Sequence, residues 1–151
     1  MSQTYQQIVQ DIKNRIFYPV YLLSGEEAYY IDQLIDLIET SVLTENEKEF
    51  NQNVLYGRDV DARTIMEYAK RYPMMASHQV LIVKEAREIE DLENLKKYLE
   101  QPLKTTLLVI GYKYKKYDKR TSLAKLVDEK GVFMFQINYM KTRYRPGYPG
   151  G

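Results

Sequence analysis

The fold of this chain can be predicted starting from residues 20–27, Val20-Tyr21-Leu22-Leu23-Ser24-Gly25-Glu26-Glu27. Its first four residues are an apolar run typical of a buried strand, and Ser24-Gly25 predicts a turn. Residues 27–40 then carry one apolar helical face, formed by Tyr30, Leu34, Ile35 and Ile38. A strand, a loop and a helix in this order are the frame of a nucleotide-binding domain.

The loop of this frame lacks the residues that hold a phosphate. A phosphate loop needs Gly-x-x-x-x-Gly-Lys-Ser/Thr, so that backbone N–H groups surround the phosphates, the Lys contacts the terminal ones and the hydroxyl holds magnesium. Here the residues from Gly25 to Asp32 are GEEAYYID. Glu26 and Glu27 suit the start of a helix better than a general acid and base pair, and they would repel a triphosphate. We therefore interpret Ser24, Gly25, Glu26 and Glu27 as a degenerate phosphate loop.

The composition is that of one domain of ordinary size. The chain has 151 residues, of which 44% are hydrophobic, and this is enough to build a core. The formal net charge of +1 gives no overall field that attracts nucleic acid or an anionic membrane, so such binding needs a local patch.

Cysteine and histidine usage excludes several chemistries. The chain has no cysteine, which excludes disulfides, thiolate catalysis and cysteine zinc sites. His78 is the single histidine, which argues against a histidine metal centre or a Ser-His-Asp triad and favours a structural or surface role for His78 itself. Composition leaves a metal site made of carboxylates alone open. We predict no catalytic residue, no metal and no cofactor.

The N-terminal segment has neither the basic start nor the apolar core of a signal peptide. No apolar run approaches the ~18 residues of a membrane span. We therefore predict a cytoplasmic protein with no membrane partner.

Strands and helices alternate along the chain. We expect helices at residues 4–15, 27–40, 61–71, 92–100 and around 123–127, and strands at 20–23, 48–55, 80–83, 106–110 and 132–136. Strands separated by such helices imply right-handed crossovers between parallel strands. The sequence therefore predicts an α/β protein, a three-layer α/β/α fold with a five-stranded, mainly parallel sheet. Residues 138–151 are basic and unperiodic and contain Pro and Gly, so we expect a separate tail there.

Four stretches of the sequence resemble one protein family. They are PVYLLSGEE at residues 19–27, FN at residues 50–51 followed by Gly57, PMMASHQVLIVK at residues 73–84, and DKR at residues 118–120. In order and spacing they are similar to the N-terminal domain of the delta subunit of the bacterial DNA polymerase III clamp loader. The resemblance implies the fold of an AAA+ ATPase, a P-loop NTPase-like fold, with a degenerate nucleotide site. Lys84-Glu85 agrees with a degenerate site, because an active ATPase of this fold is expected to have a metal-binding Asp-Glu pair at that position.

The resemblance also divides the chain. Residues 1–137 would form the AAA+-like domain, and the family's helical lid and collar domains are expected to be absent. Since the collar joins the other clamp-loader subunits, we expect no assembly with them. If the codon reading frame is shifted by one base near residues 133–135, suitable codons for the tail can encode a sequence similar to the one that family members carry there. Our hypothesis is that a frameshift makes residues 138–151 non-native.

In this family the delta subunit binds the DNA polymerase III sliding clamp (beta) and opens its ring with an apolar pair at a helix end before the third strand. The matching residues are Met74 and Met75, where the family often has Leu-Phe. Met is flexible and polarizable and suits an irregular pocket on a partner. Two Met side chains cannot supply the whole affinity, so we expect neighbouring residues such as Tyr72, Ala76 and Ser77 to add contacts. Without the family, the same pair is typical of core packing.

A second candidate site is the segment from Tyr112 to Arg120. Basic residues interleaved with aromatics can neutralise phosphates and stack on exposed bases. The alternative is a solvated loop after the fourth strand. The candidate DNA contacts are Lys113, Lys115, Lys116, Lys119 and Arg120.

The sequence predicts a clamp-loader domain that binds the sliding clamp and is not itself an enzyme. Two alternatives stay open: an ATPase with an atypical nucleotide-binding loop, and a single-stranded DNA-binding module that uses the Tyr/Lys-rich segment.

Overall fold

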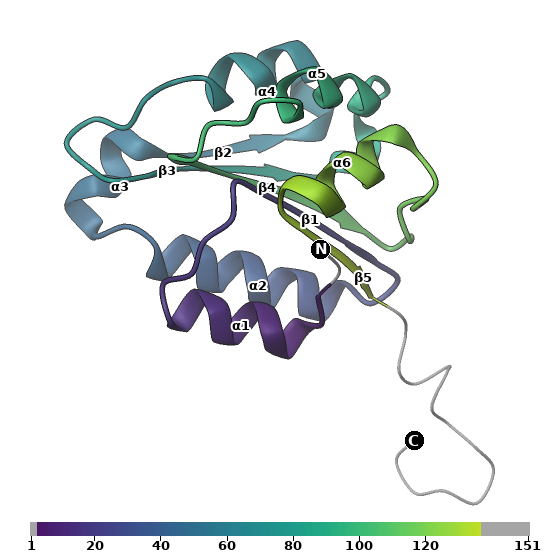
Figure 1. The fold of residues 1–151 in the computed structure, drawn as a ribbon, viewed down its shortest axis with the longest axis horizontal. Helices are drawn as coiled ribbons and strands as arrows, with labels where there is room; N and C mark the ends of the chain where they lie inside the picture. Colours follow the sequence, from purple (N-terminus) through teal and green to yellow (C-terminus); the bar gives the residue numbers. More distant parts are fainter. Residues whose placement is uncertain (1–2, 137–151) are drawn as a thin grey trace, which may run out of the picture.

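The computed structural model describes residues 3–136, and five strands form a single sheet within them (Figure 1). The strands are β1 (Val20–Gly25), β2 (Gln52–Tyr56), β3 (Gln79–Lys84), β4 (Thr106–Lys113) and β5 (Val132–Gln136). They lie in the order β2-β3-β4-β1-β5, and every neighbouring pair is parallel. The predicted α/β fold with a parallel sheet is confirmed. The expected tail at residues 138–151, with its frameshift hypothesis, lies outside the described residues.

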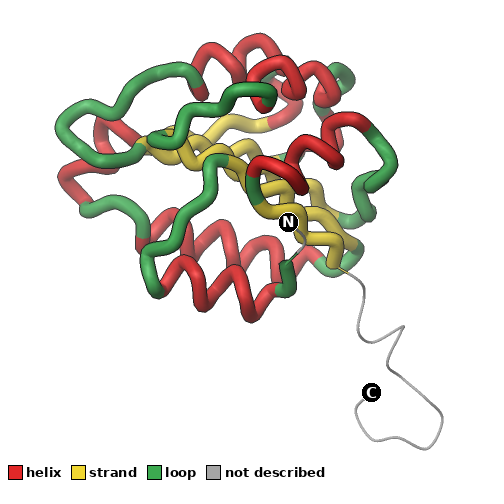
Figure 2. The backbone as a smooth tube through the Cα atoms, in the orientation of Figure 1, coloured by secondary structure: helices red, strands yellow, loops and turns green. Residues whose placement is uncertain are grey.

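Helices cover both faces of this sheet. They are α1 (Tyr5–Lys13), α2 (Ala28–Ser41), α3 (Glu45–Asn51), α4 (Ala62–Ala69), α5 (Lys96–Leu99) and α6 (Ser122–Lys130), with short 3-10 turns η1 (Gly57–Asp59), η2 (Ala86–Glu88) and η3 (Leu92–Leu95). Helices α1 and α2 lie on one side of the sheet and α4, α5 and α6 on the other (Figures 1 and 2). This is the predicted three-layer arrangement.

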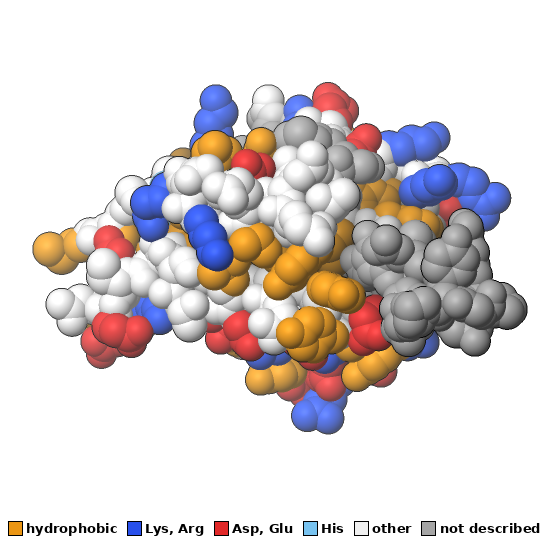
Figure 3. All heavy atoms as spheres, turned by 90° about the horizontal axis from the view of Figure 1, so that it is seen from below, with side chains coloured by type: hydrophobic (Ala, Val, Ile, Leu, Met, Phe, Trp, Pro, Cys, Tyr) orange, Lys and Arg blue, Asp and Glu red, His pale blue; other side chains and the backbone are white. Residues whose placement is uncertain are grey.

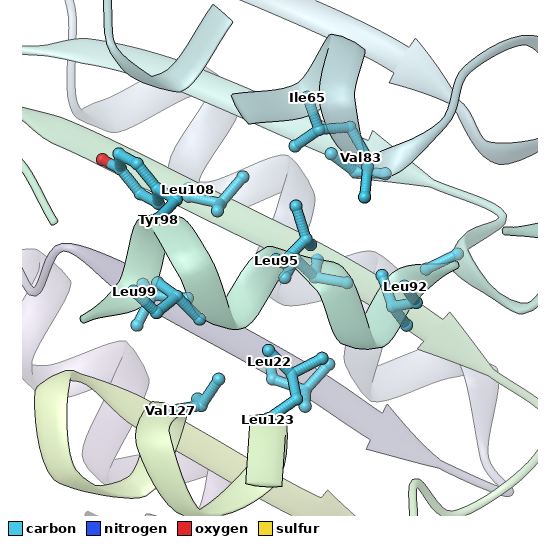
Figure 4. Close-up of a cluster of buried hydrophobic side chains, with 14 of the residues drawn as sticks. Leu22, Ile65, Val83, Leu92, Leu95, Tyr98, Leu99, Leu108, Leu123 and Val127 are labelled. Carbon is cyan, nitrogen blue, oxygen red and sulfur yellow. The ribbon is translucent and has the colours of Figure 1, made fainter. Parts of the chain in front are cut away.

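The core has two halves because successive strand residues point to opposite faces. In β1, Leu22 packs into the half beneath α4, η3, α5 and α6, whereas Leu23 packs into the half formed with α1 and α2. Figure 4 shows Leu95 and Leu99 over the sheet, with Leu123 close to Leu22. Burial on both faces explains why the strands read as continuous apolar runs rather than alternating ones.

The strand expected at residues 48–55 is wrong in its first half. Residues 45–51 form α3, and β2 begins only at Gln52. A capping box starts this helix: Thr44 Oγ1 accepts from the Glu47 amide at 3.3 Å, and Glu47 Oε1 accepts from the Thr44 amide at 2.9 Å. Phe50, expected among the apolar residues of a strand, lies on the helix with 64% of its surface exposed.

Smaller differences affect the candidate sites. On α2 the buried face includes Ile31, while Tyr30 is only half-buried. Strand β1 continues through Ser24 and Gly25, where we expected a turn. Strand β4 continues past Gly111 to Lys113, so the Tyr/Lys-rich segment begins inside the sheet. Each extension occurs where the neighbouring strand supplies partners, as in the pairing of Gly25 with Lys113.

Candidate functional site

Three exposed large apolar residues, including the two most exposed of the described chain, lie in the loop between α4 and β3, residues 70–78, at the amino end of β3. Met75 is 100% exposed, Tyr72 74% and Met74 61%. Ser77 is exposed and Ala76 is half-buried. The core-packing alternative for the methionine pair is therefore wrong. The pair also lies in the loop that follows α4, and not at the helix end that the resemblance implied.

A buried polar cluster fixes where this loop leaves α4. The Gln79 amide Nε2 lies 2.7 Å from the Arg71 carbonyl, 3.0 Å from that of Tyr68 and 2.9 Å from Thr106 Oγ1. Thr106 Oγ1 in turn donates to the Ala69 carbonyl at 2.9 Å. These contacts satisfy carbonyls that the end of a helix leaves without intrahelical partners. The start of the loop is thus anchored to two strands.

A second anchor holds the middle of the loop. Asn51, which is 1% exposed, accepts a hydrogen bond from the Met74 amide at 2.6 Å and donates one to the Met74 carbonyl at 2.9 Å. Met75 has a φ of 54°, a left-handed conformation that residues other than glycine rarely adopt. The anchor also places α3 and its exposed Phe50 beside the loop.

Sequence reasoning missed Phe50 and Asn51 as members of this site. The capping box of Thr44 and Glu47 was the available signal, because it predicts a helix through residues 45–51 and not a strand. We name four exposed residues near the amino ends of β2 and β3 the methionine surface: Phe50, Tyr72, Met74 and Met75.

His78 closes the loop through packing. Its ring meets that of Phe17 edge-on with centroids 5.5 Å apart, and Nδ1 lies 3.0 Å from Ser77 Oγ. Burial lowers the pKa of the imidazole below its usual value, and the nearby Arg15 charge acts in the same direction. These contacts fit the expected structural role of His78.

Figure 3 views the side of the molecule covered by α1 and α2. Hydrophobic side chains protrude at its left end, the end where Figure 1 places the loop into β3, and a larger group of them lies across the middle of the face. Charged side chains of both signs lie around these hydrophobic groups, in keeping with the formal net charge of +1.

The groups expected at the degenerate phosphate loop are used inside the protein. Ser24 Oγ donates to the Met134 carbonyl at 3.2 Å, and the Gly25 amide donates to the Lys115 carbonyl at 3.2 Å. Only Glu26 and Glu27 separate β1 from α2. The Glu27 carboxylate caps α2 by accepting from the Tyr29 amide at 3.3 Å.

A cavity of about 180 Å³ lies nearby, at the carboxyl ends of β2, β3 and β4. Its two lysines are paired with acids of this chain: Lys113 Nζ lies 3.0 Å from Asp32 Oδ1, and Lys84 Nζ lies 3.4 Å from Glu39 Oε1. Within residues 3–136, no three His, Cys, Asp or Glu side chains are grouped so that they could hold a metal ion. Both lysines that line this cavity are therefore already paired with acids of the chain.

The Tyr/Lys-rich segment is not presented as one stacking surface. Tyr117 is buried, and its ring packs edge-on against Tyr112 with centroids 5.0 Å apart. Arg120 forms two hydrogen bonds of 3.0 Å with Asp118 and holds the pKa of that carboxyl at about 2. Lys116 Nζ and Lys119 Nζ lie 5.3 and 5.6 Å from the centre of the Phe135 ring. Lys115 is exposed, and DNA contact by this segment stays a prediction.

None of the helices in the described part of the chain is long and apolar enough to cross a membrane.

The fold and the site define a three-layer α/β protein with an anchored, exposed apolar loop on the side of the sheet where β3 begins. The sequence model of the family "DNA polymerase III, delta subunit" matches residues 21–136, and the chain belongs to this family.

Similar proteins agree with this assignment. The DNA polymerase III subunit delta of Bacillus subtilis (strain 168) is 25% identical over an alignment that covers 89% of this chain and 41% of the relative. The solved structure of the Bacillus subtilis DNA clamp loader delta protein (YqeN) matches with a TM-score of 0.76 and 22% identity, over 89% of this chain and 42% of that one. A DNA polymerase III gamma subunit-related protein of Thermotoga maritima matches with a TM-score of 0.54, at 14% identity, over 90% of this chain and 47% of that one.

The chain therefore spans about two fifths of the delta relatives that it matches. The structural matches, both below 25% identity, support the fold.

Proposed function

We propose that this chain is the clamp-binding part of a clamp-loader delta subunit. Met74 and Met75 enter an apolar pocket on the DNA polymerase III sliding clamp, and binding favours an opened ring during DNA replication. The protein acts in the cytoplasm and neither binds nor hydrolyses ATP. The observation that carries the proposal is the full exposure of Met75, beside Met74, in a loop that is hydrogen-bonded to the buried side chain of Asn51.

The two methionines can anchor such a contact but cannot supply all of its free energy. Burial of two Met side chains contributes about 3 to 6 kcal/mol of transfer free energy. Micromolar affinity needs about 8 kcal/mol after the losses of association. The exposed rings of Phe50 and Tyr72 supply additional apolar area, and Ala76 and Ser77 lie at its border.

The mechanism is a shift of population. A binding protein favours the open ring only by the difference between its affinities for open and closed clamps. A loop with a fixed shape suits this role, because a flexible loop would fit both states of the clamp.

The absence of ATP binding rests on the first strand and helix. A phosphate at this place would have to displace the Lys115 carbonyl from the Gly25 amide and meet the carboxylate of Glu27 at the start of α2. Family members use further domains to assemble, and the hydrolysis that drives loading belongs to other subunits in this proposal.

The test is calorimetric titration of the chain with the sliding clamp of its own organism. We expect the double variant Met74→Ala, Met75→Ala to bind at least about tenfold more weakly while its circular dichroism spectrum is unchanged. Tyr114→Ala is the matched control, because Tyr114 is 65% exposed and follows the carboxyl end of β4, whereas the methionine loop lies at the amino end of the neighbouring parallel strand β3. Equal affinities of the double variant and the unmutated chain would contradict the proposal.

A further inference from the structure

The loop that carries the methionine pair has little support from its own backbone. In the described chain, no hydrogen bond between backbone groups joins residues 72–78 to one another or to another segment. Met75 also adopts a left-handed conformation with a φ of 54°. Such a segment needs side-chain contacts from elsewhere to keep a single shape.

The side chain of Asn51 supplies that contact at Met74. Its Oδ1 accepts from the Met74 amide at 2.6 Å, and its Nδ2 donates to the Met74 carbonyl at 2.9 Å. Nδ2 also donates to the Glu47 carbonyl at 2.9 Å, which ties the same amide group to α3. Asn51 therefore pairs with Met74 as a neighbouring strand would, and all of its hydrogen-bonding groups are used.

The position of Asn51 makes this support rigid. Asn51 is the last residue of α3 and directly precedes β2, which pairs with β3. With 1% of its surface exposed, its side chain is out of reach of a partner that docks on the loop. Aspartate cannot replace it, because a carboxylate accepts from the Met74 amide but has no hydrogen to donate to the Met74 carbonyl.

We propose that Asn51 is a positioning residue that fixes the Met74–Met75 loop in its exposed shape before a partner binds. This inference rests on the proposed binding of the sliding clamp through the two methionines. A preformed loop does not lose conformational freedom on binding, so affinity depends on a residue that never contacts the clamp.

The experiment compares Asn51→Ala with Asn53→Ala, the same change two residues along the chain at a side chain for which the described structure shows no hydrogen bond. In calorimetric titrations with the sliding clamp, we expect Asn51→Ala to bind about tenfold more weakly and Asn53→Ala to bind normally. In a Met75→Ala background, the effect of Asn51→Ala should shrink, because the residue acts through the loop.

A second measurement uses the unmutated protein and does not depend on the folding of a variant. By NMR, the Met74 amide should exchange with solvent at least about tenfold more slowly than the Met75 amide. Equal exchange of the two amides overturns the inference.

The outcomes separate the inference from the proposed function. If a folded Asn51→Ala variant binds normally while the double methionine variant does not, the positioning role is wrong and the binding proposal stands. If the effect of Asn51→Ala is the same in the Met75→Ala background, the residue acts on general stability and the inference is overturned. Normal binding by the double methionine variant overturns the proposed function and the inference together.

Discussion

Gln79 Nε2 lies 2.9 Å from Thr106 Oγ1, and this contact joins β3 to β4 directly beneath the end of α4. Both side chains are buried, at 4% and 0% exposure, in a fold whose other core residues are almost all apolar. Together they bond to the carbonyls of Tyr68 and Ala69 at the end of α4 and to that of Arg71 beyond it, and so set the direction in which the chain enters the methionine loop. The buried polar pair of Gln79 and Thr106 therefore positions the start of the loop that carries Met74 and Met75.

Loss of this pair should destabilise the protein. Gln79→Leu keeps the volume but removes the donor to the Arg71 carbonyl and to Thr106, so buried acceptors lose their partner. We expect the free energy of unfolding in urea to fall by about 2 to 3 kcal/mol. Gln101→Leu, at an exposed glutamine, is the control and should change it by less than about 0.5 kcal/mol. Equal stability of the two variants would contradict the role of the pair.

Gly57→Ala should be strongly destabilising. A Cβ atom at Gly57 would lie 1.9 Å from the backbone carbonyl oxygen of Glu85, which cannot move aside easily. We expect a loss of about 2 to 4 kcal/mol in the free energy of unfolding. At Gly111 the nearest atom to an added Cβ is the end of the Ile35 side chain at 3.0 Å, so Gly111→Ala should cost clearly less. The reverse ranking in urea titrations would show that the close approach at Gly57 is not a constraint.

Stability should decline at alkaline pH through Tyr21. Burial raises the pKa of its hydroxyl from 10.0 to about 12. Because the pKa of the folded state is the higher one, this contribution is complete below pH 10.0 and is lost as the pH rises toward about 12. Unfolding free energies measured over this range should fall less steeply for Tyr21→Phe than for the unmutated protein. Tyr29→Phe, at an exposed ring, should follow the unmutated protein, and identical slopes for all three would exclude the effect.

Millimolar ATP with magnesium should leave the melting temperature unchanged. The Gly25 amide is already bonded to the Lys115 carbonyl, and Glu27 occupies the start of α2. ATP at ten times its dissociation constant would raise the free energy of unfolding by about 1.4 kcal/mol, which thermal scanning detects. Magnesium alone is the control, and a rise in melting temperature that depends on ATP would favour the ATPase alternative.

The layers of the fold could be predicted from the sequence because they depend on local patterns. Continuous apolar runs such as residues 80–83 identify strands buried on both faces, and helical spacing identifies α1, α2, α4 and α6. The one false strand segment arose because Phe50 was counted as a core residue, although α3 carries it on its exposed face. The ends of β1 and β4 were missed because their last pairings depend on neighbouring strands and not on apolar pattern.

The site was only partly predictable. The resemblance indicated Met74 and Met75, but an apolar pair reads the same whether it is packed in the core or offered to a partner, and exposure decides between the two. The support from Asn51 spans 23 positions of the chain, and that from Thr106 to Ala69 spans 37, so no local pattern contains either. Contacts of this kind follow from the order of strands in the sheet.

NMR of methionine methyl groups can show whether the methionine pair is the contact with the sliding clamp. The chain has six methionines, among them Met134, which is 1% exposed in β5 and serves as an internal control. With methyl-labelled protein and the unlabelled clamp of the same organism, we expect the Met74 and Met75 methyl resonances to shift on binding and the Met134 resonance to stay in place. Binding that leaves the Met74 and Met75 resonances unchanged would show that the clamp contacts another surface of the protein and not the methionine pair.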